Sequence, residues 1–258
     1  MKRLALCLTL IFCTGRAVGQ DWQSDPLLPI ILAYEALEQN ADPSSRARAI
    51  GELPHQWPDT RPIAIEARAA TAASLIRQIE AVQTDREIDK AILLRLLQVH
   101  VDARVNDTAR IPFTGDWGFH AEPLFASMQT RLMRVEDAEA WIACLNDLPR
   151  YFQENTDNMR RGIATGWTAY ADPVDTMKQQ IEEQITDVPE DSPLFSPFIT
   201  MSPTIHMDDV LRLRAEGRDA VVRAIDAYRL TLAFIETEYE PHLREKAGIA
   251  GLPGGRRV

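Results

Sequence analysis

Histidines, cysteines and paired carboxylates are the side chains of this sequence that could do chemistry, and their spacing decides what they can do. A helical zinc site needs two histidines four residues apart and a carboxylate that activates water, because both rings then face one ion. The histidines are His55, His100, His120, His206 and His242, and no two of them are that close. The sequence therefore predicts no metal ligand in this chain.

Other catalytic motifs are also missing or incomplete. The fragment His120-Ala121-Glu122 matches the His-x-Glu part of the zinc deaminase signature, but the partner Pro-Cys-x-x-Cys is absent. Cys144 stands between Ala143 and Leu145, which favours a small buried thiol over a nucleophile. The sequence has neither the Gly-x-Ser-x-Gly of a serine hydrolase nor a glycine-rich phosphate loop that opens a helix. We predict no catalytic and no cofactor-binding residue.

Charged side chains near the middle of the chain have structural interpretations. Glu136 and Asp137 fit the start of a helix, where carboxylates are stabilised by the helix dipole. Asp137 and Glu139 are two residues apart and would point to different helix faces, so they do not form a catalytic pair. Arg160-Arg161 could bind a carboxylate, although we favour a solvated helix face.

Four tryptophans stand in segments predicted to be connectors. These are Trp22, Trp57, Trp117 and Trp167. We favour anchoring of loops or core over the alternative, which is that they line a groove for a peptide.

The first residues have the plan of a secretory signal peptide. Lys2 and Arg3 precede an apolar run at 4–12, and small residues follow at Ala17 and Gly19. We therefore predict a signal peptide at 1–19 and an exported mature protein, which would be periplasmic or extracellular. Lipoprotein anchoring at Cys13 is a minor alternative. No other segment is long and apolar enough to suggest a membrane span.

Composition restricts the remaining function classes. The chain of 258 residues has 28 basic and 38 acidic residues, for a net charge of −10, and no segment concentrates basic charge. Nucleic acid is therefore excluded as a partner. Because Cys7 and Cys13 would leave with the signal, Cys144 would have no disulfide partner. The fold must rest on its apolar core, which the 45% hydrophobic content can supply.

The pattern of apolar residues predicts an all-α fold. In the first half, helices are expected near 28–37 and 63–82, with a proline-rich connector at 54–62 between them. Thr84 and Glu87 suggest a capping box before a further helix. The apolar face of that helix would comprise Ile88, Ile92, Leu96 and Val99, with Leu93 and Leu97 beside them.

In the second half, a loop at 106–118 precedes a helix at 136–148, and Pro149 would begin a new helix. Another helix would follow Asp172-Pro173 and run through Met177, Ile181 and Ile185. The prolines at 189–203 suggest an extended connector. The segment 206–246 predicts a long helix that Gly217 could interrupt and Pro241 would bend or end. Its apolar face comprises Val221, Ile225, Tyr228, Leu232, Ile235 and Tyr239.

Several short words occur in an order and spacing that resemble one bacterial family. They are Glu136-Asp137-Ala138-Glu139-Ala140-Trp141, Leu148-Pro149-Arg150, Asn158-Met159-Arg160-Arg161-Gly162-Ile163-Ala164-Thr165-Gly166, Ser192-Pro193-Leu194, Ser196-Pro197-Phe198, and Ala227-Tyr228-Arg229 with Phe234-Ile235, Glu238-Tyr239, Pro241, Arg244-Glu245 and Gly248. Together they resemble the DUF885 proteins.

The resemblance implies an exported, long helical chain similar to gluzincin-type zinc metallopeptidases. In that family the His-Glu-x-x-His helix lies well beyond the matched segment, and this chain stops soon after Leu252-Pro253-Gly254-Gly255. The resemblance therefore implies a helical amino-terminal region at 20–258 that forms one wall of a substrate cleft. The zinc of complete members would have no ligand in this chain.

Three functional hypotheses follow. The first is a truncated amino-terminal part of a DUF885-type zinc peptidase, inactive alone, whose partners would be a peptide substrate or the missing catalytic half. The second is an exported helical module that binds a partner without catalysis. The third is a complete enzyme with an unrecognised site, which chelator-sensitive peptidase activity would reveal.

Overall fold

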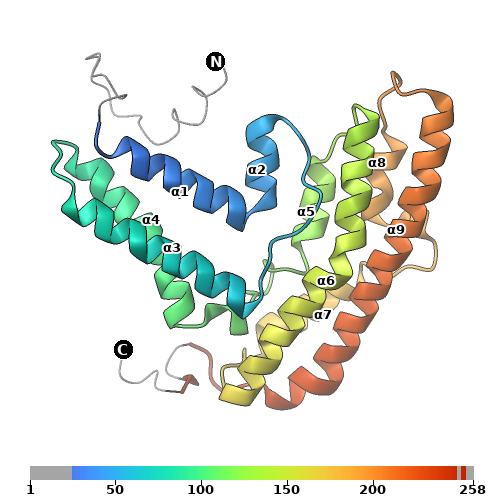
Figure 1. Ribbon diagram of the computed structural model, residues 1–258. Helices are drawn as coiled ribbons and strands as arrows, with labels where there is room; N and C mark the ends of the chain where they lie inside the picture. The colour runs from blue at the N-terminus through green and yellow to red at the C-terminus, as the bar shows by residue number, and fades with distance from the viewer. Residues whose placement is uncertain (1–24, 249–250, 254–258) are drawn as a thin grey trace.

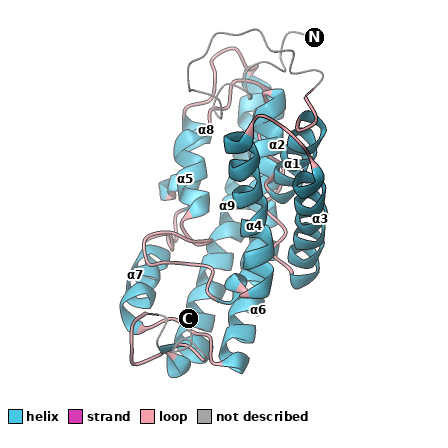
Figure 2. Cartoon of the chain, turned by 90° about the vertical axis from the view of Figure 1, so that its left-hand side faces the viewer, coloured by secondary structure: helices cyan, strands magenta, loops and turns pink. Residues whose placement is uncertain are grey.

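The computed structural model describes residues 25–248 and 251–253, and within them helices account for all the regular secondary structure (Figure 1, Figure 2). The α-helices are α1 (Leu28–Ala41), α2 (Pro43–Ile50), α3 (Pro62–Ala81), α4 (Glu87–Val105), α5 (Glu122–Gln129), α6 (Val135–Thr165), α7 (Ala171–Glu182), α8 (Ser196–Ile199) and α9 (Met207–Phe234). In the same residues, β-pairing is limited to two isolated bridges. The all-α prediction is confirmed, whereas the predicted signal peptide at 1–19, with Cys13, lies outside the described residues, as does Trp22.

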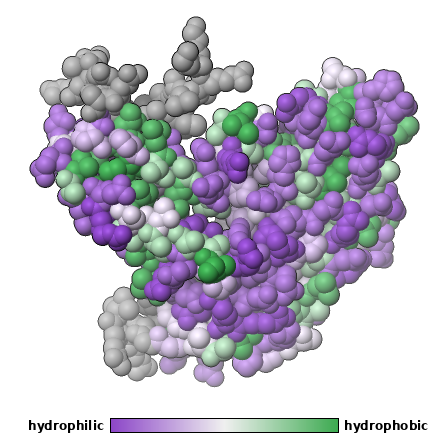
Figure 3. All heavy atoms as spheres, in the orientation of Figure 1, coloured by the Kyte–Doolittle hydropathy of each residue, from purple (hydrophilic) through white to green (hydrophobic). Residues whose placement is uncertain are grey.

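Two hydrophobic cores divide the helices into two units. The first unit comprises α1, α3 and α4, whose core includes Leu27, Ile79 and Leu97. The second is built on the long helices α6 and α9, which run side by side with α7 and α8 behind them (Figure 1). None of the described helices is long and apolar enough to cross a membrane. Apolar patches colour the surface of the first unit in Figure 3, while the face over α6 and α9 is mostly hydrophilic.

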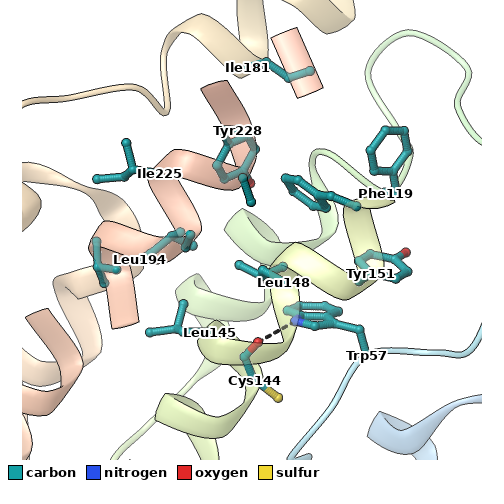
Figure 4. Packing of buried hydrophobic residues seen from close by; sticks show 14 of the residues in the cluster. Trp57, Phe119, Cys144, Leu145, Leu148, Tyr151, Ile181, Leu194, Ile225 and Tyr228 are labelled. Atoms are coloured by element: carbon teal, nitrogen blue, oxygen red, sulfur yellow. Dashed lines mark hydrogen bonds between the residues drawn. The ribbon is translucent and has the colours of Figure 1, made fainter. Parts of the chain in front are cut away.

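The predicted break at Pro149 is wrong, because α6 continues through it from Val135 to Thr165. A proline inside a helix removes one hydrogen bond and costs about 3 kcal/mol. Leu145 and Leu148 are buried before Pro149 (Figure 4). Phe152 is buried after it, on the same helical face. Since burial of each such side chain contributes about 1.5–3 kcal/mol, packing outweighs the loss of that bond.

The helix predicted after Thr84 forms as α4, but its packing differs from the prediction. The capping box is wrong: Thr84 Oγ1 accepts a hydrogen bond from the Arg86 amide, and no side chain caps α4. The core instead takes Leu93 and Leu97. The predicted apolar face is turned largely outward, with Ile88 77%, Ile92 40% and Val99 51% exposed. α4 therefore has two apolar faces, and only one of them is covered by the described chain.

The connector predicted at 189–203 is also more regular than expected. Prolines begin the short turns of helix Pro189–Asp191, Pro193–Phe195 and α8, because the ring fixes a backbone angle suited to a first helical turn. α7 ends at Glu182, before the predicted Ile185.

The last long helix, α9, begins at Met207 and has no interruption at Gly217. It is followed by a π-helical turn, Ile235–Tyr239, and by the 3-10 turn Glu240–His242, where Pro241 ends the helix as predicted. Five of the six residues of its predicted apolar face are buried, and Leu232 packs against the same core as a partly buried side chain.

The proline-rich connector between α2 and α3 ties the two units together. The Trp57 indole is buried and donates a hydrogen bond from Nε1 to the Cys144 carbonyl at 2.9 Å (Figure 4). The Trp57 amide donates to Asp147 Oδ2 at 2.8 Å, so the connector follows the side of α6. The short helix α2, which the sequence analysis did not predict, is capped by Asp42.

Candidate functional site

A cleft of about 590 Å³ lies between the two units. Its walls come from α3 and α4 on one side and from the segment 108–118, α5 and α6 on the other, with Thr60 of the connector between them. The polar residues that line it are Thr60, Arg68, His100, Thr108, Thr114, Glu122 and Asn155. The cleft exists because α3 and α4 pack mainly with each other and α1, so few direct helix contacts close the gap.

The connector wall of the cleft is held by buried polar groups of α6. Glu154 Oε2 accepts hydrogen bonds from the Thr60 amide at 2.9 Å and the Thr60 hydroxyl at 3.3 Å. Glu154 Oε1 pairs with Arg150 Nη1 at 2.8 Å, and Asn158 Nδ2 donates to the Thr60 carbonyl at 2.8 Å. Because buried polar groups are costly unless paired, this network fixes Thr60 in place.

The α6 wall contributes an amide, and α5 contributes a carboxylate. Asn155 is buried, and its Nδ2 donates to the Tyr151 carbonyl at 2.8 Å. The Tyr151 hydroxyl donates to Glu122 Oε2 at 2.5 Å. Burial and the neighbouring Glu122 charge raise the pKa of Tyr151, so its phenol stays protonated and remains a donor. The Tyr151 ring stacks on Trp57 with centroids 5.5 Å apart.

The opposite wall carries positive or titratable groups. Arg68 Nη1 donates to the Asp59 carbonyl at 2.9 Å, and burial lowers the pKa of Arg68 from its ordinary value. His100 Nε2 lies 2.6 Å from Glu38 Oε1, so this ring is held by the first unit. The cleft thus has a carboxylate on one side and a guanidinium on the other.

A tight turn places Trp117 at the cleft. The Thr114 amide donates to the Trp117 carbonyl at 2.8 Å, and Phe113 pairs with Gly118 in an isolated bridge. Gly118 has a φ of 155°, and a side chain there would meet Phe113 Cβ at 2.6 Å. Trp117 is 61% exposed and stacks on Phe125 with centroids 4.5 Å apart.

The groups that line this cleft can contact a ligand. Amide, hydroxyl, carboxylate and guanidinium groups can form hydrogen bonds with peptide groups, and the aromatic and aliphatic lining can cover side chains. No group of histidine, cysteine, aspartate or glutamate residues within 25–248 and 251–253 is arranged to hold a metal ion.

The structure separates the histidines considered in the sequence analysis. His55 and His242 are exposed, and His206 caps the start of α9, where its Nδ1 accepts from the Asp208 amide at 3.3 Å. His120 is buried, and its Nε2 contacts Gln180 Oε1 at 2.8 Å. His120 and Glu122 therefore contact different partners, Gln180 and Tyr151, and do not form a shared site.

The predicted roles of Cys144 and of the acidic residues at the start of α6 agree with the structure. Cys144 is buried, and burial together with the Asp147 charge raises the pKa of its thiol to about 12. Asp137 Oδ2 accepts from the Arg134 amide at 2.9 Å at the start of α6. Glu139 faces elsewhere and pairs with Arg212 at 3.2 Å.

Arg160 and Arg161 remain partly exposed on α6, as the favoured interpretation expects, and they also bind carboxylates. Arg160 donates from Nε and Nη2 to the two carboxylate oxygens of Glu238, each at 2.8 Å. Arg161 donates to Asp107 at 2.7 and 3.1 Å. Both guanidiniums bind carboxylates of this chain, so they hold its own loops and helix ends.

The tryptophans divide between the two interpretations. Trp57 is a buried anchor, and Trp167 lies beneath the Arg110 guanidinium, 4.2 Å from the ring centroid. Trp117 instead lines the cleft. The alternative that this groove holds a peptide stays a prediction.

Comparison with known proteins places the sequence in a family. The family described as "Bacterial protein of unknown function (DUF885)" matches residues 45–258. The chain belongs to the DUF885 family. No curated protein sequence matches it.

Among solved structures, this DUF885 chain is similar to the crystal structure of a "putative lipoprotein" from Colwellia psychrerythraea. The TM-score is 0.74 at 13% sequence identity, so the similarity concerns the fold. The match covers 90% of this chain and 44% of that chain, so the DUF885 chain described above spans less than half of the solved relative.

The sequence analysis did not assign Thr60, Glu122 or Asn155 to a cleft, and it did not identify Tyr151, which binds Glu122. Glu122 was considered only as part of a metal motif. The polar run Glu154 to Asn158 on an otherwise core-facing helix could have indicated buried polar contacts. Nothing in the sequence indicated which distant residues those groups would bind.

Proposed function

We propose that this chain contributes the peptide-binding cleft of a DUF885 protein that hydrolyses peptides with zinc. The zinc ligands and the general base would lie in the part of longer relatives that this chain does not span. The observation that carries the proposal is the cleft between the two units, whose lining combines peptide-bonding groups with apolar side chains. The reaction class rests on the expectation from the sequence analysis that DUF885 proteins resemble gluzincin-type zinc metallopeptidases.

The proposal predicts peptide binding without turnover. Purified protein should increase the fluorescence anisotropy of labelled, unstructured decapeptides, and mass spectrometry should show the same peptides uncleaved with added zinc. Ala103 of α4 lines the cleft, so Ala103→Trp should fill part of it and weaken binding. Ala70→Trp is a matched control, because Ala70 is exposed on α3 and does not line the cleft.

Two results would contradict this function. Chelator-sensitive cleavage by this chain would mean that it holds a complete catalytic site. Equal binding by the Ala103→Trp and Ala70→Trp variants would mean that peptides bind elsewhere.

The exposed face of α4 favours a second candidate function, an interaction module that binds a partner helix. Ile88, Ile92 and Val99 form an outward apolar stripe at helical spacing. Under this function the protein should bind a dye for apolar surface, and Ile88→Glu with Val99→Glu should abolish that signal without unfolding. Peptide binding lost in Ala103→Trp would favour the first function instead.

We also propose that the protein is exported, with residues 1–19 removed and 20–258 forming one helical region. The plan of the first residues supports this location, and the solved relative is described as a lipoprotein. Fractionation of expressing cells and mass measurement of the mature chain would test it. A cytoplasmic, uncleaved product would contradict it.

A further inference from the structure

The Trp117 side chain presents an indole face that the described chain leaves uncovered. One face of the ring stacks on Phe125 at an interplanar angle of 17°, and 61% of the residue is exposed. Large exposed apolar side chains in a cleft mark ligand contacts more often than isolated ones elsewhere on a surface.

This indole is held in place by its turn. Phe113 is buried and packs edge-on against Tyr239 with centroids 6.2 Å apart. Gly118 lies so close to Phe113 that no side chain fits there, and the hydrogen bond from Thr114 to Trp117 closes the turn. Trp117 is therefore fixed before a ligand arrives, which lowers the entropy cost of binding.

A carboxylate lies on the same helical face as the stacking partner. Glu122 begins α5 three residues before Phe125, so the two side chains are neighbours on one face. Glu122 Oε2 accepts from the Tyr151 hydroxyl. Within residues 25–248 and 251–253 no lysine or arginine forms an ion pair with Glu122, although most arginines of this region are paired. Trp117 and Glu122 line the same cleft.

We infer that Trp117 and Glu122 form a subsite for an arginine side chain of a peptide, which rests on the proposed peptide-binding function. The planar guanidinium stacks on the open indole face and donates hydrogen bonds to the Glu122 carboxylate. Lysine fits less well, because its ammonium group is not planar and cannot stack on the indole ring. The net charge of −10 favours basic peptides over acidic ones.

The test compares peptides that differ at one side chain. The probes are blocked pentapeptides of alanine with a central arginine, citrulline, phenylalanine or alanine, and calorimetry measures the dissociation constant of each with purified protein. Citrulline keeps the shape of arginine without its charge. The arginine peptide should bind about tenfold tighter than the citrulline peptide, from the combined stacking and ion pair.

Variants locate the effect. Trp117→Ala and Glu122→Gln should each reduce the preference for arginine over citrulline to about threefold or less. Glu122→Gln keeps an oxygen that can accept from Tyr151, so the fold is preserved. Glu139→Gln is the matched control, because Glu139 is exposed on α6 and pairs with Arg212 away from the cleft.

The outcomes separate this subsite from the proposed function. If all four peptides bind equally, or the phenylalanine peptide binds tightest, the arginine subsite is wrong while peptide binding stands. A preference for arginine that persists in both cleft variants also overturns it. If none of the peptides binds and the labelled decapeptides also fail to bind, the proposed function itself is wrong.

Discussion

At the scale of single residues, His120 links the fold to pH. Its ring is buried beside Phe119, and Nε2 contacts Gln180. Burial lowers the pKa of His120 below its ordinary value of 6.5, so the folded protein keeps the ring neutral. The unfolded chain binds a proton near pH 6.5. The stability contributed by the neutral ring is therefore complete above that pH and is lost as the pH falls below it.

We expect the free energy of unfolding to fall between pH 7 and pH 5.5 because of this residue. His120→Gln should show a smaller decrease, since glutamine does not titrate. Urea unfolding at the two pH values measures both. An equal decrease in the two proteins would show that other groups cause it.

Residue-scale chemistry also explains why the sequence indicated the cleft so poorly. The side chains that carry it are an amide, a hydroxyl and a carboxylate, which have no diagnostic spacing. Asn155 and Glu122 come from different helices, and both form a hydrogen bond with Tyr151: Asn155 with its carbonyl and Glu122 with its hydroxyl. By contrast, the burial of Cys144 was predictable, because its neighbours in the sequence are apolar and helical.

At the scale of helices, Gly217 shows how close packing selects a residue. A side chain at this position of α9 would meet the Phe198 ring at 2.5 Å, and that ring is fully buried. In a free helix, alanine would be favoured over glycine by about 1 kcal/mol. Here the overlap with the ring should dominate.

Gly217→Ala should therefore destabilise the protein by about 1–3 kcal/mol in urea unfolding. Adding Phe198→Leu should recover part of that loss, because the smaller side chain leaves room for the new methyl group. If the single variant is more stable than the natural protein, the packing explanation is wrong.

The sequence predicted that most of the long helices form. It did not predict where they end or which helices pack against each other. The periodicity of α9 predicted its buried face, because that face contacts one continuous core. The break predicted at Pro149 was wrong, because local propensity cannot show that the segments of α6 before and after this proline bury the same apolar stripe. For α4, two apolar faces competed, and only the packing of α1 and α3 decided that Leu93 and Leu97 turn inward.

At the scale of the whole molecule, the connector at 51–61 attaches the first unit to α6. Glu154 holds Thr60 and Arg150 from a buried position. Removing its carboxylate leaves the Thr60 amide without its acceptor and takes one of two carboxylates from the Arg150 guanidinium, which keeps its pair with Asp147. A buried donor without an acceptor is more costly than loss of an exposed pair.

Glu154→Ala should lower the free energy of unfolding by about 2–3 kcal/mol and should speed proteolysis within 51–61. Glu139→Ala is the comparison, because its pair with Arg212 is exposed and contributes at most about 1 kcal/mol. Similar proteolysis of the two variants would mean that Glu154 does not hold the connector.

The presence of two separate hydrophobic cores has a consequence for recognition. Because each interior is complete within its own unit, the distance between the walls can vary without opening either of them. Trp57 and Thr60 are bound to α6, so the motion would be concentrated where α3 and α4 join the second unit. A bound ligand that contacts both walls restricts the distance between them, and the protein loses conformational entropy on binding. Ligands of equal contact area can then differ in affinity according to the spacing at which they hold the walls.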